Sequence, residues 1–242
     1  MSVTLVPQEM PRCDSEEISC AERLAFERLL GDLSAQFADL PAERVIDEIA
    51  GALRRLIDFL GFDRCSFGEL MGPEGPFQVL CSVARDGFEA TPLGPAPPLP
   101  WYLGELRAGR TVVLPNIPTD FPPQATAEIE YCGRIGLQSN LGIPLRVSGR
   151  VIGVITFTAF QRTRAWPEDL IIRLKIIGEV LAQALVRSRR EAELAAALAE
   201  ITRLKERLEA ENDYLRLSAG PGAGKGLASR SAAFTRVLEE IA

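Results

Sequence analysis

The chain has 242 residues, a formal net charge of −6, and contains 47% hydrophobic and 25% charged residues. This composition is typical of a soluble globular protein, and the acidic balance argues against a nucleic-acid-binding surface spread over the whole chain. The sequence contains no histidine, which excludes Ser-His and Cys-His catalytic pairs and removes the commonest metal ligand.

Two amphipathic helices are predicted within the first 61 residues. Apolar residues recur at helical spacing between residues 18 and 37, and Asp14 with Glu17 resembles a capping box. Pro41 suits the first turn of a second helix, and Gly61 is placed to end it.

The central part of the chain favours antiparallel strands. Two apolar strands flank the tight-turn pair Ser148-Gly149, which predicts a hairpin. Gly142 and Gly153 stand inside these strands, where glycine indicates a close backbone approach or a bulge. The preceding region predicts a hairpin at 62–70 and 77–85, a proline-rich loop at 91–100, a short helix at 101–109, a short strand at 111–116, and a helix in the second half of 121–136.

A single long helix is predicted from Pro167 to Leu217. Its first half, residues 167–187, carries a wide apolar stripe that suits packing on a sheet or on the first helices. The order of elements predicts an α+β fold, with an antiparallel sheet flanked by helices and followed by a long C-terminal helix.

The second half of this helix has a seven-residue period. Such a period is typical of a coiled coil, so we expect a parallel homodimer with an apolar seam. Glu200 and Lys205 fall at positions that would meet across that seam. The alternative is a single charged helix that lies on its own domain. The predicted seam residues are Leu194, Ile201, Leu204, Leu208 and Leu215.

The glycine-rich run 218–230 fails the requirements of a phosphate-binding loop. A Walker A motif needs a glycine where Ala219 stands and a hydroxyl where Gly226 stands, and it follows a buried strand, not a charged helix. We therefore interpret the run as a flexible linker.

Dispersed cysteines and the lack of targeting segments favour a cytoplasmic protein. No apolar run reaches 18 residues and no signal-peptide pattern is present, so no membrane association is expected. None of the cysteines forms a CxxC motif, which predicts reduced, buried thiols; Cys65 and Cys81 on neighbouring strands leave a redox pair open as an alternative. The cysteines are Cys13, Cys20, Cys65, Cys81 and Cys132.

Two parts of the sequence resemble known families. The stretch "LAEITRLKERLEAENDYLR" followed by "GLASRSAAFTRVLEEIA" resembles the connector and the opening of the ATPase domain in sigma-54-dependent transcriptional activators. The preceding stretches "FDRCSFGEL", "LPWYLGELRAGRTVVL", "LQSNLGIPLRVSGRVIGVITF" and "RAWPEDLIIRLKIIGEVLAQAL" resemble a GAF domain, a signal-sensing module of such activators and of sensor kinases.

This resemblance implies an N-terminal tail at 1–17, a GAF-like sensor domain at 18–187, a coiled-coil signalling helix at 188–217, and a linker with the truncated start of an ATPase domain at 218–242. The chain ends before an ATPase site or a DNA-binding domain could follow. We therefore expect a regulatory module that is not an enzyme and does not itself bind DNA. The open alternatives are a dimerisation scaffold without a ligand, the sensor input of a histidine kinase, and an ATPase.

The resemblance also places any ligand between the sheet and the excursion at about 90–136. Aromatic side chains with one cation and one amide suit a small aromatic or anionic ligand. Each candidate also has a purely structural interpretation, in the core, at the sheet edge or in solvent. The chain lacks the residue patterns for cyclic GMP and for a bilin, and no metal or other cofactor is expected. The candidate ligand-binding residues are Trp101, Tyr102, Tyr131, Arg85 and Asn140.

Overall fold

The computed structural model describes residues 20–38, 40–72 and 75–219. These residues fall into two units, Met1–Ser188 and Arg189–Ala242, whose boundary lies within the last helix. The predicted N-terminal tail, the Asp14–Glu17 capping box, and the glycine-rich linker with the ATPase-like segment after residue 219 lie outside the described residues.

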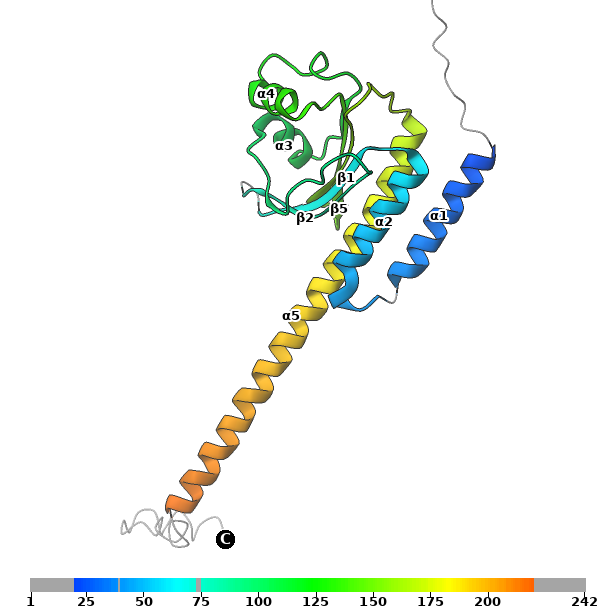
Figure 1. The fold of residues 1–242 in the computed structure, drawn as a ribbon. Coiled ribbons are helices and arrows are strands. Elements are labelled where there is room, and N and C mark those ends of the chain that lie inside the picture. Colours follow the sequence, from blue (N-terminus) through cyan, green and yellow to red (C-terminus); the bar gives the residue numbers. More distant parts are fainter. Residues whose placement is uncertain (1–19, 39, 73–74, 220–242) are drawn as a thin grey trace, which may run out of the picture. The chain divides into compact units, whose positions relative to one another are not determined.

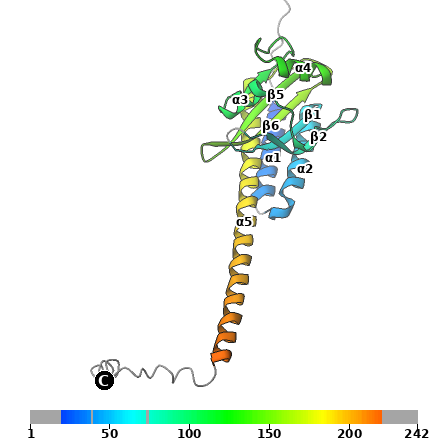
Figure 2. The same ribbon diagram turned by 90° about the vertical axis from the view of Figure 1, so that its left-hand side faces the viewer.

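The first unit is built on one antiparallel sheet of six strands in the order β3-β2-β1-β6-β5-β4. Both predicted hairpins are confirmed, and Ser148 and Gly149 form the second turn with φ angles of 52° and 78°. Figure 2 shows the sheet between its flanking helices. The strands are β1 (Arg64–Leu70), β2 (Phe77–Ala84), β3 (Gly94–Pro95), β4 (Val112–Leu114), β5 (Ser139–Val147) and β6 (Arg150–Ala159).

Helices cover both faces of this sheet (Figure 1). The helices α1, α2 and the first part of α5 form a layer on one face, which we call the helix face. The shorter helices α3 and α4 cover the other face, which we call the cavity face. The helices are α1 (Cys20–Ala38), η1 (Ala42–Arg44), α2 (Val45–Leu60), α3 (Pro100–Arg107), α4 (Thr126–Ile135) and α5 (Glu168–Ala219).

The predicted helix boundaries follow from backbone chemistry. Pro41 precedes the first helical turn of η1, and Gly61 ends α2 in the left-handed conformation with φ 67°. The predicted long helix is a single element, α5, that starts directly after Pro167. The α+β prediction is confirmed, whereas the two-residue strand β3 lies inside the segment predicted as a proline-rich loop.

Strand β6 divides its side chains between the two faces. Ile155 and Phe157 are fully buried on the helix face, whereas Val154 belongs to the core of the cavity face. This alternation is what a period of two residues requires. Gly178 lets α5 approach the sheet closely, because a Cβ atom there would lie 2.7 Å from Leu145 Cδ2.

The second unit contains the rest of α5. Every described side chain from 189 to 216 is exposed. Ion pairs within the helix join Arg203 to Glu200 at 2.7 Å and Lys205 to Glu209 at 3.7 Å, a spacing that supports an isolated helix. In the part of the chain that the structure describes, no helix is long and apolar enough to cross a membrane.

Candidate functional site

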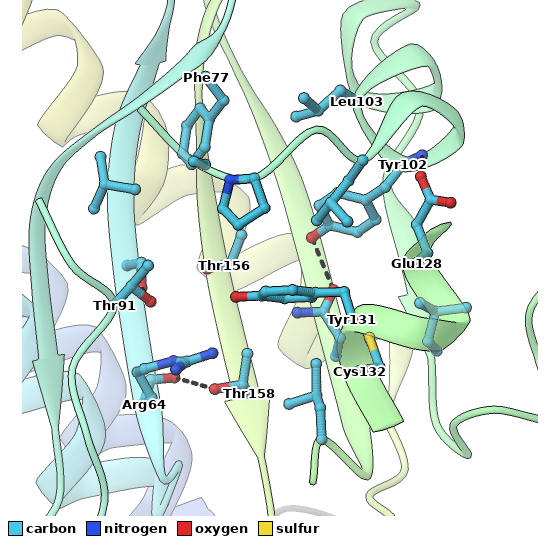
Figure 3. A pocket seen from close by; sticks show the side chains of 18 of the residues that line it. Arg64, Phe77, Thr91, Tyr102, Leu103, Glu128, Tyr131, Cys132, Thr156 and Thr158 are labelled. Atoms are coloured by element: carbon cyan, nitrogen blue, oxygen red, sulfur yellow. Dashed lines mark hydrogen bonds between the residues drawn. The ribbon is translucent and has the colours of Figure 1, made fainter. Parts of the chain in front are cut away.

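A cavity of about 90 Å³ lies between the cavity face of the sheet and the helices α3 and α4 (Figure 3). Strands β1, β2, β5 and β6 supply its floor, and the two helices with the loop before α3 supply its walls. Most of its lining is apolar, which suits an organic ligand. The apolar lining residues are Phe77, Val79, Ala96, Pro97, Leu99, Leu103, Leu114, Phe121 and Leu137.

Tyr102 on α3 and Asn140 on β5 fix one end of the cavity. The Tyr102 hydroxyl donates a 2.8 Å hydrogen bond to Asn140 Oδ1, and burial raises the pKa of that hydroxyl. Gly142 permits this arrangement, because any Cβ atom at that position would collide with the Tyr102 hydroxyl. At Gly142 the approaching group is therefore a side chain, whereas at Gly153 the predicted close backbone approach is present, because a Cβ atom there would collide with the Gly68 carbonyl oxygen.

Glu128 on α4 is a buried acid at the same end, with 1% of its surface exposed. Its Oε1 accepts a 3.1 Å hydrogen bond from the backbone N–H of Tyr102 in the first turn of α3. That position stabilises the carboxylate, since the free N–H groups and the dipole of a helix favour negative charge there. Glu128 Oε2 has no hydrogen-bond partner in the structure.

Arg64 at the start of β1 reaches the opposite end of the cavity, beneath the ring of Tyr131 (Figure 3). Its guanidinium lies 4.7 Å from the centre of the Phe160 ring, and Nη1 is 3.4 Å from the Glu89 carbonyl oxygen. The Nε atom is buried without a hydrogen-bond partner. Burial lowers the pKa of Arg64, and contact with Tyr131 opposes that change.

No carboxylate among the described residues forms a salt bridge with Arg64. Arg64 is partly buried, and an anion that paired with it would offset the cost of that burial. Arg64 is also the one cation among the lining residues of the cavity. The site therefore combines an apolar interior with a positive charge that has no anionic partner.

Hydroxyl groups fasten the loop before α3 to the sheet. Ser66 on β1 is 2.9 Å from the hydroxyls of both Ser82 and Thr91, and the Thr91 backbone N–H donates to Ser82 at 2.9 Å. Thr158 on β6 donates to the Arg64 carbonyl oxygen at 3.2 Å. These bonds hold the floor and the loop together beside Arg64.

The structure brings together three of the five predicted ligand-binding residues. Tyr102, Tyr131 and Asn140 line the cavity, but Trp101 and Arg85 do not. Successive helical residues differ by about 100° in direction, so Trp101 points away from Tyr102 and packs edge-on against Phe121, with the ring centres 5.7 Å apart. Whether any of the three contacts a ligand remains a prediction.

Arg85 lies outside the cavity because it has another partner. Its guanidinium donates to the buried carboxylate of Asp63 at 2.6 Å. The second oxygen of Asp63 accepts the backbone N–H of Phe160 at 2.8 Å. Arg85 therefore has a structural role at the ends of the strands.

The sequence analysis missed Arg64 and Glu128. An arginine at a strand start and a glutamate in a first helical turn are ordinary surface residues in sequence. Only the packing of α4 against the sheet puts them around one cavity, so no local pattern could have identified them.

The cysteines divide between the two faces. Cys132 lines the cavity, whereas Cys65 and Cys81 belong to the core of the helix face. Burial raises the pKa of Cys132 and of Cys81 to about 12 each, and raises that of Cys65 as well. Thiols with raised pKa values are poor nucleophiles. Within residues 20–38, 40–72 and 75–219, no group of three His, Cys, Asp or Glu residues could hold a metal ion.

A wider surface cleft of about 890 Å³ adjoins the cavity. Arg64, Thr91 and Tyr131 line both spaces. The cleft continues over the loop at 87–92 and past Arg134. Arg64 and Tyr131 therefore stand at the boundary between the enclosed cavity and the surface.

The antiparallel sheet carries two short helices over a cavity on one face and a layer of longer helices on the other face, which defines an α+β sandwich of the sensor-domain type. The family model "GAF domain" matches residues 44–185. The chain belongs to the GAF family, whose domains are signal-sensing regulatory modules in phytochromes and similar sensors. No protein of curated function matches the chain in sequence.

Solved structures agree on the fold. The phycocyanobilin-bound GAF domain of a cyanobacterial phytochrome matches with a TM-score of 0.58 and 20% identity over 69% of this chain and 96% of that one. The photosensory core module of the Stigmatella aurantiaca phytochrome matches with a TM-score of 0.59 and 20% identity, over 85% of this chain and 46% of that one. Free methionine-R-sulfoxide reductase from Neisseria meningitidis matches with a TM-score of 0.52 and 17% identity, over 72% of this chain and 95% of that one. At these identities the likeness concerns the fold alone.

Proposed function

We propose that the chain is the signal-sensing input region of a transcriptional regulator, in which the GAF domain takes up a small ligand and the helical connector joins two copies. One observation carries this proposal. The predicted seam residues on α5 are large and apolar, and between 43% and 65% of their surface is exposed. Such a stripe at seven-residue spacing suits burial against a second copy of the same helix.

The sheet offers a short physical route from the cavity to α5. On β6, Thr156 and Thr158 line the cavity, and the intervening Phe157 packs into the helix face. Gly178 brings α5 into direct contact with that face. A ligand that binds one packing arrangement more tightly than another would shift the equilibrium between them by that difference in affinity.

The transcriptional context rests on the sequence after the domain. Residues 195–242 resemble the connector and ATPase opening of sigma-54-dependent activators. This favours a transcriptional output over a histidine kinase, although residues 220–242 lie outside the described part of the chain. The output in this proposal belongs to a domain that follows the connector.

In this proposal the cavity binds a ligand. It neither catalyses a reaction nor attaches a bilin. Cys132 is the one described cysteine in the lining, and its raised pKa disfavours the thiolate that a nucleophile requires. Cavities for ligands of drug size enclose roughly 300 Å³ or more, so about 90 Å³ is too small for a tetrapyrrole. Bilin attachment usually uses a cysteine beside a histidine, and the sequence contains no histidine.

Sedimentation analysis of seam variants of the full chain tests the dimer. Ile201→Asp with Leu208→Asp introduces two charges into the stripe, and we expect a monomer. Ala199→Asp with Thr202→Asp adds the same charges to the same helix away from the stripe, and we expect it to remain dimeric. A dimer that survives the first pair of substitutions would show that the copies associate through another surface.

A further inference from the structure

Arg64 is the feature that the proposed function leaves unexplained. Its Nε is buried without a partner, and its guanidinium contacts an aromatic ring, a carbonyl oxygen through a long hydrogen bond, and the neighbouring Tyr131. A desolvated guanidinium costs free energy unless an anion pairs with it. No Asp or Glu among the residues that the structure describes pairs with Arg64. We therefore expect the ligand to supply the anion that pairs with this guanidinium.

The second charge in the lining limits what that anion can be. Glu128 stands near the Tyr102 end, away from Arg64, and its carboxylate is nearly fully buried (Figure 3). The Cys132 thiol lies between Glu128 and Arg64. Apart from burial, Glu128 raises the pKa of Cys132 and Arg64 lowers that pKa. A second anionic group at the far end of the ligand would be repelled by an ionised Glu128, which disfavours dicarboxylates.

The walls and the volume specify the rest of the ligand. Val79 and Leu103 belong to the apolar lining that a hydrocarbon tail would contact. An apolar cavity of about 150 Å³ holds benzene, with its six heavy atoms. At that ratio, a cavity of about 90 Å³ holds about four heavy atoms. The carboxylate itself can lie at Arg64, on the boundary with the outer cleft, and leave the cavity to the tail.

We propose that the ligand of this GAF domain is a short aliphatic monocarboxylate, whose carboxylate pairs with Arg64 and whose tail of two to four carbons fills the apolar cavity. This inference rests on the proposed function, since it names the ligand class of the same site. The planar fork of an arginine matches a carboxylate with two parallel hydrogen bonds. Tyr131 borders Arg64 at the boundary between the cavity and the outer cleft.

The test is calorimetric titration of the full chain with sodium butyrate, at constant ionic strength set with sodium chloride. We expect saturable binding of butyrate and propionate, and none of butyramide, which has the same tail without the charge. Arg64→Gln should weaken butyrate binding about 10- to 100-fold, the typical value of a charge-assisted hydrogen bond. Arg150→Gln removes the same charge from an exposed position at the start of β6 and should leave binding unchanged.

A second variant tests the size of the cavity. This test remains available even if the Arg64→Gln variant does not fold. Val79→Leu fills part of the cavity while the charge stays in place. We expect weaker binding of butyrate and retained binding of the shorter propionate. Equal binding of butyramide, or no saturable binding of any of these acids to the folded wild-type chain, would overturn the inference. The oligomeric state of the seam variants is measured without ligand, so the proposed function and this inference can fail separately.

Discussion

The two faces of the sheet differ in what their side chains do. On the helix face, Leu53, Leu174 and Ile177 are fully buried among other hydrocarbons. On the cavity face, buried Glu128 and partly buried Arg64 stand beside an unfilled space. Polar atoms without partners and empty volume both reduce stability. The contrast indicates that the helix face stabilises the domain more than the cavity face does, and it supports our proposal that a ligand binds on the cavity face.

The largest loss of stability is expected from a substitution on the helix face. Leu174→Ala removes a fully buried side chain between α5 and the sheet, and should lower the free energy of unfolding by about 2–5 kcal/mol. Leu103→Ala, at a partly exposed position in the cavity lining, should cost clearly less. Urea unfolding of both variants measures the difference. Equal losses would show that the two faces contribute alike to stability.

Chemical reactivity gives a second comparison. Because burial raises the pKa of Cys81 and of Cys132 to about 12, iodoacetamide should alkylate both thiols at pH 8 about 1,000-fold more slowly in the folded chain than in urea. Mass spectrometry of the labelled peptides measures the rates. Fast labelling of Cys132 alone would mean that the cavity opens readily to solvent.

The same shifts set a dependence of stability on pH. An ordinary thiol titrates near 9.0, and these two titrate at about 12 when folded. Between these values the unfolded chain binds fewer protons than the folded chain, so stability should fall as the pH rises from about 9 to 12. Replacing Cys81 and Cys132 with alanine should reduce that slope, as measured by urea unfolding across this range.

Tyr102→Phe tests the polar end of the cavity. The substitution removes the donor to Asn140 Oδ1 and leaves a buried acceptor, so the free energy of unfolding should fall by about 1–3 kcal/mol. The double variant with Asn140→Leu should recover part of that loss, because it removes the unsatisfied group. No recovery would indicate that Asn140 has a second buried partner.

The smallest effect is expected at Thr156. Thr156→Val keeps the shape of the side chain on the cavity face and removes a hydroxyl for which the structure gives no hydrogen bond. The free energy of unfolding should change by less than about 0.5 kcal/mol. A larger loss would reveal that this hydroxyl has a structural partner, and the face would then be less tolerant than we infer.

The helix face was far easier to predict from sequence than the cavity face. Apolar spacing indicated α2 and the first half of α5, and local turn chemistry placed Pro41, Gly61 and the turn at Ser148. These are short-range signals that each element carries by itself.

The site depends on long-range packing instead. Tyr102, Asn140 and Tyr131 were identified through the resemblance to GAF domains, and the structure places them around the cavity. Arg85 was attractive because it is a cation at a strand end, but Asp63 binds it. Arg64 occupies a similar strand-end position in sequence. Only the folded sheet shows which of the two arginines lacks an acid.

The most direct test of this division between the faces is a methyl NMR titration of the full chain with sodium butyrate. We predict saturable shifts that are largest for methyl groups of the cavity lining, such as Val79, Leu103 and Leu114, and smaller for those of Leu53 and Ile177 across the sheet. Shifts centred on the helix face, or unsaturable shifts scattered over the surface, would contradict the assignment of binding to the cavity face.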